Sequence, residues 1–182
     1  MGKHYDTLTS ELEAWLAQQK VFFVSTAPLS ADGHLNCSPK GSDTFRVLGG
    51  REVAYLDFTG IGIETVAHIQ ENSRIVIKFC AFSGAPRIVR LHGKGRVIYP
   101  NTGDFERLKA LFPHSVSTRA IIGVTLTRIS DSCGWGVPCY DFAGSRDALE
   151  KWANQKGAEG LSEYRVAQNR TSIDGLPGCQ KV

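Results

Sequence analysis

Long apolar runs are missing from the 182-residue sequence. No stretch approaches the roughly 20 consecutive apolar residues that a membrane-crossing helix needs, so we expect no membrane contact. Residues 1–20 lack the apolar centre of a secretory signal, which predicts a cytoplasmic protein. Internal repeats and low-complexity tracts are missing as well. The chain is therefore expected to form a single domain over residues 1–182.

Clusters of one charge sign are also scarce. The 21 Lys and Arg residues exceed the 18 Asp and Glu residues by three, and the basic residues form no run of the type that binds polyanions, so nucleic acid is not an expected partner. The five histidines are dispersed and the five cysteines show no Cys-x-x-Cys spacing. We therefore expect no metal site and find no nucleophile–base pair. Cys179, in a polar tail, is expected to be an exposed thiol.

The sequence does contain a series of short β-rich runs separated by turn residues. A first helix is predicted from a capping box of Ser10 and Glu13, and an extended tail from residue 171 onward. Parallel strands need helix-length crossovers, so this order favours a mainly β antiparallel barrel with peripheral helices. Strands are expected at 21–29, 34–41, 45–48, 51–58, 74–82, 87–100 and 119–129. Further helices are expected at 64–72, 104–112, 146–156 and 158–168.

The stretch YLDFTGIGIETVAH (55–68) places a Gly60–Ile61–Gly62 turn between a strand and a helix start. A dinucleotide-binding fold needs a third glycine where Thr65 stands, and the strand belongs to a hairpin, so that interpretation fails. Two others remain open. The helix start offers unpaired N–H groups to an anion, or the turn only connects the helix to the barrel.

Two further segments place polar side chains along one strand face. In NCSPKG (36–41), Ser38 and Lys40 alternate to the same face, where a hydroxyl and an ammonium suit a phosphate group. In RIVRLHGKGR (87–96), cationic or imidazole side chains recur at every second position, which is typical of the solvated face of an antiparallel sheet. The glycines between them also permit close approach of a ligand or a second chain.

The loop SCGWGVPCYDF (132–142) is dense in glycine, proline and aromatic residues. Trp135 stands between two glycines, an unusual place for a core side chain. The pattern is compatible with packing against the barrel or with stacking on a ligand or a partner.

The chain resembles the pyridoxamine 5′-phosphate oxidase-like family of FMN-binding split barrels over roughly residues 10–155. Four segments carry the resemblance: FVSTAPLSADGHLNCSPKG, AYLDFTGIGIETVAHIQENSRIVIKFCAF, RIVRLHGKGRV and CGWGVPCYDF. It implies an antiparallel Greek-key split barrel and a homodimer with FMN in a cleft between two barrels, where Trp135 reaches across from the partner subunit. It further implies cofactor contacts from Ser38, Lys40, Asp57, Thr59, Glu64, Thr65, Arg87, Arg90 and Trp135. The candidate catalytic proton donors are His68 and His92.

Two departures from the oxidases themselves shape the expected function. Their Arg-Lys pair for the FMN phosphate corresponds here to Ile61 and Gly62, and their C-terminal substrate-binding Arg and His are missing. The resemblance therefore implies an FMN-dependent oxidoreductase acting on a small organic substrate other than pyridoxamine phosphate. The alternative is a cofactor-free relative that binds or transforms an apolar metabolite, with Ile61 and Ile63 filling the phosphate end of the dimer cleft. A haem-handling relative is a third possibility.

Overall fold

The structure is a computed structural model that describes residues 2–179. Its strands are β1 (His4–Tyr5), β2 (Phe22–Thr26), β3 (Asn36–Lys40), β4 (Phe45–Gly49), β5 (Glu52–Phe58), β6 (Arg74–Cys80), β7 (Ile88–Ile98) and β8 (Thr118–Ser132). Its helices are α1 (Ser10–Gln18), α2 (Glu64–Asn72), α3 (Gly103–Lys109) and α4 (Ala148–Gln168). Within residues 2–179, none of the helices has both the length and the hydrophobicity of a bilayer-spanning segment.

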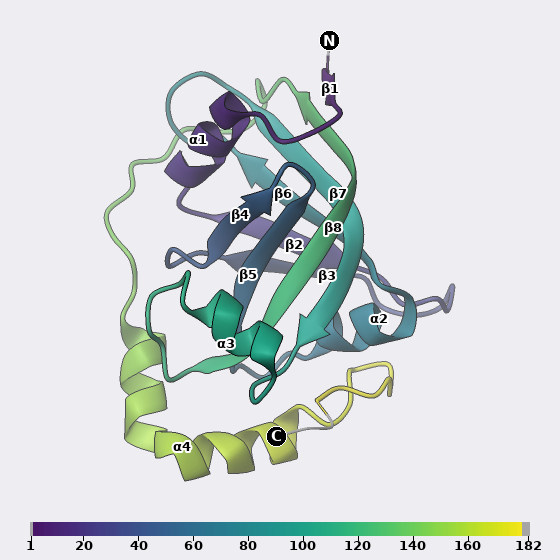
Figure 1. The fold of residues 1–182 in the computed structure, drawn as a ribbon, viewed down its shortest axis with the longest axis vertical. Helices are drawn as coiled ribbons and strands as arrows, with labels where there is room; N and C mark the ends of the chain where they lie inside the picture. Colours follow the sequence, from purple (N-terminus) through teal and green to yellow (C-terminus); the bar gives the residue numbers. More distant parts are fainter. Residues whose placement is uncertain (1, 180–182) are drawn as a thin grey trace.

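All strands belong to one antiparallel sheet with the neighbour order β3-β2-β6-β7-β8-β5-β4, and β1 pairs with β8 (Figure 1). The sheet curls, because Phe22 of β2 and Phe45 of β4 have ring centroids only 5.5 Å apart although four strands separate them in that order. No strand pairing joins β3 to β4 in the described chain, so the barrel is split there. The non-consecutive neighbours β2–β6 and β5–β8 are those of a Greek key. The predicted mainly β split barrel is confirmed.

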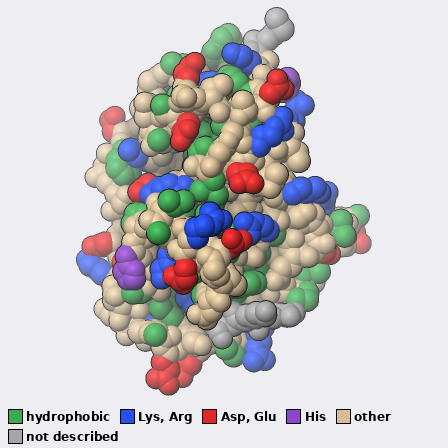
Figure 2. Space-filling model, viewed as in Figure 1, with side chains coloured by type: hydrophobic (Ala, Val, Ile, Leu, Met, Phe, Trp, Pro, Cys, Tyr) green, Lys and Arg blue, Asp and Glu red, His purple; other side chains and the backbone are tan. Residues whose placement is uncertain are grey.

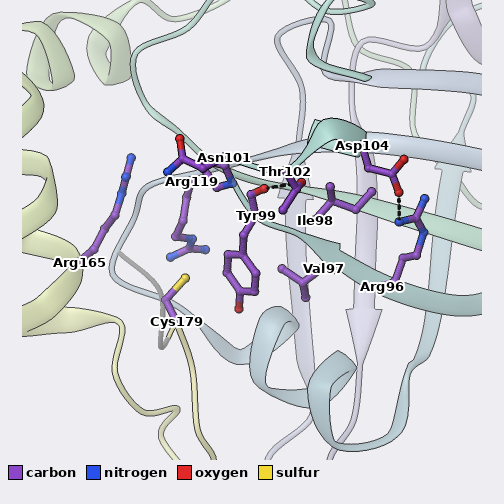
Figure 3. Close-up of a pocket in the computed structure, with 11 residues that line it drawn as sticks. Arg96, Val97, Ile98, Tyr99, Asn101, Thr102, Asp104, Arg119, Arg165 and Cys179 are labelled. Atoms are coloured by element: carbon purple, nitrogen blue, oxygen red, sulfur yellow. Dashed lines mark hydrogen bonds and ion pairs between the residues drawn. The ribbon is translucent and has the colours of Figure 1, made fainter. Parts of the chain in front are cut away.

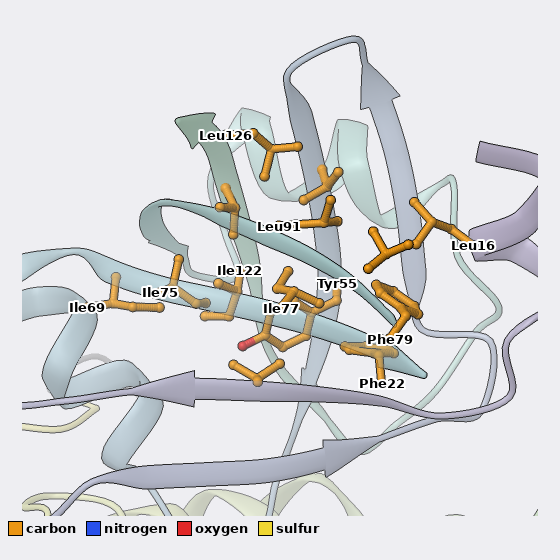
Figure 4. Close-up of a cluster of buried hydrophobic side chains, with 14 of the residues drawn as sticks. Leu16, Phe22, Tyr55, Ile69, Ile75, Ile77, Phe79, Leu91, Ile122 and Leu126 are labelled. Atoms are coloured by element: carbon orange, nitrogen blue, oxygen red, sulfur yellow. The ribbon is translucent and has the colours of Figure 1, made fainter. Parts of the chain in front are cut away.

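Apolar side chains from the strands and from helices α1 and α2 fill the interior of the barrel (Figure 4). Alternate residues of each strand point inward, and Tyr55, Phe79 and Leu91 are at most 1% exposed. Helix α1 contributes Leu12 and Leu16 to the same cluster. Burying each large apolar side chain contributes about 1.5–3 kcal/mol, so the barrel is a rigid support for the side chains at its rim.

Most predicted elements are present, with two local differences. The cap of helix α1 lies one residue before the predicted one, because the hydroxyl of Thr9, not Ser10, accepts a hydrogen bond from the Leu12 N–H at 3.3 Å. The two helices predicted at 146–156 and 158–168 form the single element α4, interrupted at Gly157, whose φ of +67° only glycine adopts readily.

The C-terminal tail is not extended, so that prediction is wrong for residues 171–179. Thr171 forms a β-bridge with Pro177, and Gly175 turns the chain with a φ of +76°. The side chain of Gln70 on α2 donates to the carbonyls of Pro177 and Gly178 at 2.9 and 3.0 Å. The tail therefore folds back onto α2 (Figure 1); residues 180–182 lie outside the described chain.

Charges of both signs are distributed over the surface. Figure 2 shows Lys and Arg side chains interspersed with Asp and Glu on one face, with no continuous basic area. Within residues 2–179, no three His, Cys, Asp or Glu side chains are grouped to hold a metal ion.

Candidate functional site

The predicted site residues lie on two opposite faces of the sheet. Ser38 and Lys40 stand opposite the buried Val24 and Phe22, so they point toward the barrel interior at the β3 edge. On β7, by contrast, Leu91 is buried, and its neighbours Arg90 and His92 point outward. The structure therefore does not bring these residues into one cleft of a single protomer.

Asp57 is the centre of a buried ion-pair network. One carboxylate oxygen lies 3.2 Å from Lys40 Nζ and the other 2.8 Å from Arg119 Nη2, and the Asp57 side chain is 1% exposed. Burial alone would raise the pKa of Asp57, but Arg119 and then Lys40 lower it below the usual value. Asp57 is thus ionised and fully engaged in holding the fold, although Lys40 keeps further N–H donors.

Arg119 joins this network to the predicted phosphate turn and to the tail. Its Nη1 donates to the carbonyl of Gly62 at 3.1 Å and to Asn169 Oδ1 at 2.8 Å. Asn169 in turn donates to the carbonyls of Gly60 and Ile61 at 2.9 and 3.2 Å. The turn is therefore held by donors that contact its carbonyl oxygens.

Sequence reasoning missed Arg119 and Asn169. Arg119 opens an apolar run in β8, and a charged residue at the start of a buried strand requires a partner, which is the signal that would have found it. Asn169 ends a helix without any comparable pattern.

The start of α2 does not fit a phosphate group. Ile63 takes the cap position without a side-chain hydrogen bond and is 1% exposed, and Gly178 of the tail packs against it. The carboxylate of Glu64 lies beside the turn and accepts from the N–H of Ile173 at 3.4 Å. An acidic side chain and the tail thus cover the helix start. Ile63 is buried in this space, whereas Ile61 is 74% exposed on the surface of the protomer.

The two predicted threonine contacts are engaged within the fold. Thr59 is buried, and its hydroxyl accepts from Arg165 Nε at 2.9 Å. The hydroxyl of Thr65 accepts from Asn36 Nδ2 at 2.9 Å. Asn36 also accepts from Ser38 at 3.1 Å, so a hydrogen-bonded polar row follows the β3 edge.

His68 is a core residue. It is fully buried, with Nδ1 2.9 Å from the hydroxyl of Thr26, while Nε2 has no partner within residues 2–179. Burial lowers the pKa of His68, and nearby carboxylates oppose this only in part. A proton donor needs access to its substrate, so the structure favours His92 over His68 for the predicted catalytic role.

Acid should destabilise the protein through His68. The folded state holds the imidazole neutral, whereas the unfolded chain takes up a proton near pH 6.5. The contribution of His68 to the free energy of unfolding is therefore fully present above about pH 6.5, and it is lost as the pH drops toward the lower pKa of the folded state. We expect the urea midpoint to fall less between pH 7.5 and 5.5 (approximate values that bracket the ordinary His pKa) in His68→Gln than in the parent chain. An unchanged pH dependence would contradict this, and the exposed His114→Gln is the control.

The outer face carries a hollow of about 390 Å³ that includes His92. Cys37, Ser25, Val76 and His92 form one row across β3, β2, β6 and β7, and Leu35 at its edge is 83% exposed. Burial, and then the positive charges of two neighbouring arginines, lower the pKa of His92. The imidazole is thus neutral near pH 7 and able to accept a proton.

Arg90 and Arg87 lie toward the Ser132 end of β8. Arg90 donates to Ser132 at 2.8 Å, and Arg87 pairs with Asp131 at 2.9 Å and stacks over Trp15 with its guanidinium 5.3 Å from the ring centroid. Arg87 is thereby kept apart from the Asp57 network, because Arg119 stands at the other end of β8. Trp135 lies on the loop that follows β8, and its side chain is 85% exposed.

Comparisons with known proteins agree with the fold. A family profile described as pyridoxamine 5′-phosphate oxidase matches residues 8–133. The pyridoxamine 5′-phosphate oxidase family protein ustO of Aspergillus flavus is 38% identical over 199 residues, covering 98% of this chain and 78% of that protein.

Solved structures share the architecture at low identity. A variant of HupZ from group A Streptococcus gives a TM-score of 0.53 at 19% identity, over 69% of this chain and 99% of that one. An FAD-binding protein from Mesorhizobium loti gives a TM-score of 0.50 at 10% identity, over 72% of this chain and 96% of that one. These structures are similar in fold alone, whereas the profile and the Aspergillus relative establish descent: this chain belongs to the pyridoxamine 5′-phosphate oxidase family.

Proposed function

We propose that this protein is an FMN-dependent oxidoreductase that acts, as a homodimer, on a small organic substrate other than pyridoxamine phosphate. Family membership supports a flavin cofactor. The observation that supports a flavin site on the outer face is the hollow there, in which an apolar wall meets the neutral His92. When bound, FMN supplies the hydride chemistry that amino-acid side chains lack.

The outer face suits a flavin better than the start of α2 does. Val76 and Cys37 offer an apolar surface for a planar ring, and Lys78 stands opposite Arg90 in the next row. These cations have no carboxylate partner within residues 2–179, so they remain available to a phosphate group. At the start of α2, in contrast, the carboxylate of Glu64 would repel a phosphate group.

A second copy of the chain would complete this site. The exposed Leu35 borders the hollow, and covering it would exclude water from the bound ring. The exposed Trp135 is the further predicted contact that a partner barrel would bring near the cofactor. His92 would accept the proton that leaves the substrate as the hydride is transferred, because its imidazole is neutral near pH 7.

Absorbance and flavin titration test this proposal. We expect bands near about 375 and 450 nm in FMN-loaded protein and a light-scattering mass of two chains. Arg90→Gln should weaken FMN binding by about tenfold, the size of one charge-assisted contact. The matched control is the exposed Lys94→Gln on the same strand, which stands opposite Arg74 and not beside Lys78.

Two results would reject the proposal: a protein that takes up no FMN, or a strict monomer. The first would favour the cofactor-free alternative, which one observation supports. Ile63 and the tail close the helix start where the resemblance places the phosphate end. In that case an apolar metabolite, not a flavin, would occupy the outer hollow.

A further inference from the structure

A separate cavity of about 740 Å³ lies between the end of β7, β8, helix α4 and the tail (Figure 3). None of its lining residues lines the outer-face hollow, so the two spaces are distinct. Three arginines, Arg96, Arg119 and Arg165, line it, and Asp104 is the one carboxylate among its lining residues. The excess of positive charge points to an anionic occupant.

Arg165 is the arginine whose charge is not balanced. Arg96 pairs with Asp104 at 3.0 Å, and Arg119 pairs with Asp57 behind the cavity wall. Arg165 is half-buried and donates only to neutral groups within residues 2–179, the hydroxyl of Thr59 and the carbonyl of Thr118, at 2.9 and 3.2 Å.

The surroundings of Arg165 disfavour its charge. Burial, and then the neighbouring Arg119, lower the pKa of Arg165. A bare guanidinium in such a place is stabilised by an incoming anion, because the anion supplies both a counter-charge and hydrogen-bond acceptors.

The remaining walls define the rest of the ligand. Val97, Pro100 and the ring of Tyr99 give one apolar side. The hydroxyl of Tyr99 already donates to Gln70 Oε1 at 2.7 Å, so it does not compete for the ligand. Asn101, exposed and beside Arg165 in Figure 3, offers an amide. The volume falls within the range of small-molecule sites and far exceeds an inorganic ion.

We propose that this cavity binds a small organic oxyanion, a carboxylate or phosphate monoester with an apolar body, whose charged group contacts Arg165. The apolar body lies against Val97 and Pro100, and Asn101 donates to the same charged group. The site is independent of flavin, because the outer hollow and this cavity share no residue.

Calorimetric titration of the full chain tests the proposal with phenyl phosphate, benzoate and the uncharged benzyl alcohol. We expect saturable binding of at least one anion and at least about tenfold weaker binding of the alcohol. Preference between phenyl phosphate and benzoate then tells which oxyanion the site takes.

Variants assign the site to Arg165. Arg165→Gln should weaken anion binding by about tenfold or more, whereas Arg170→Gln, which removes the same charge from an exposed position five residues on, should change it less than about twofold. Asn101→Asp leaves every hydrogen bond of Arg165 in place and adds a negative charge at the rim. It should also weaken binding, which keeps the test valid if Arg165→Gln is unstable.

Three results would overturn the proposal. The first is no binding of either anion, and the second is equal binding of the alcohol. The third is displacement of the anion by FMN, which would make the cavity the phosphate pocket of the flavin. Failure of FMN to bind at all would reject the proposed function and leave this inference untouched, so the two are tested separately.

Discussion

Asp57→Asn is expected to lower the free energy of unfolding by about 3–5 kcal/mol, the usual cost of leaving a buried charge without its partner. Asparagine keeps the size and shape of the side chain, but it leaves both Arg119 and Lys40 without their shared carboxylate. Arg119 is 4% exposed, so water cannot replace the lost charge. Urea unfolding at pH 7 measures the difference.

The same variant should lose its effect in acid. The pKa of Asp57 is lowered in the folded state, so its stabilisation is complete above the ordinary Asp pKa of about 4 and is lost as the pH falls through the folded value. The difference in the free energy of unfolding between the parent and Asp57→Asn should therefore become smaller below about pH 4.

The control is Asp104→Asn, which breaks the exposed pairs with Arg96 and Arg107 and should have little effect. A loss for Asp57→Asn as small as that of this control would show that the network does not hold the barrel rim and the turn together.

Gly178→Ala is expected to release the tail from the barrel. A Cβ at this position would lie 2.4 Å from the carbonyl oxygen of Asn169 and 2.7 Å from a side-chain carbon of Ile63. Neither neighbour has room to move, since both are buried. Overpacking of this kind costs about 1–3 kcal/mol, enough to weaken a tail held mainly by hydrogen bonds.

Thiol labelling detects the release. In the parent chain Cys37, Cys133 and Cys139 are exposed, whereas Cys179 is buried, so the predicted exposed thiol at Cys179 is wrong. We expect three fast-reacting thiols in the parent and a fourth in Gly178→Ala.

Gly60→Ala is the matched control, because its Cβ would meet no atom within 4 Å. The same number of fast thiols in Gly178→Ala and in the control would mean that the tail tolerates the added methyl group.

Local features of the fold were predictable because local chemistry sets them. The strands predicted at 45–48 and 51–58 form the β4–β5 hairpin, and helix α2 has the predicted bounds 64–72. Period-two alternation correctly placed Ser38 and Lys40 on one face. Each of these follows from residues only a few positions apart.

The site depended on contacts that no local pattern encodes. Asp57 and Arg119 are 62 positions apart, and Asn169 is 50 further on. The tail was predicted to be extended because its turn residues give no sign of what they pack against; only the surface of α2, with Gln70 and Ile63, explains why it folds back. Pairing between buried polar groups that are distant in the sequence could thus not be predicted from local patterns.

The position of Pro39 in β3 has a consequence for how copies of this chain assemble. Strand β3 ends the sheet, and proline gives its free edge one main-chain donor fewer. A neighbouring molecule that added a strand there would leave a carbonyl unsatisfied. Growth into fibres by strand addition at β3 is therefore disfavoured, and a second barrel that approaches this edge has to meet it through side chains.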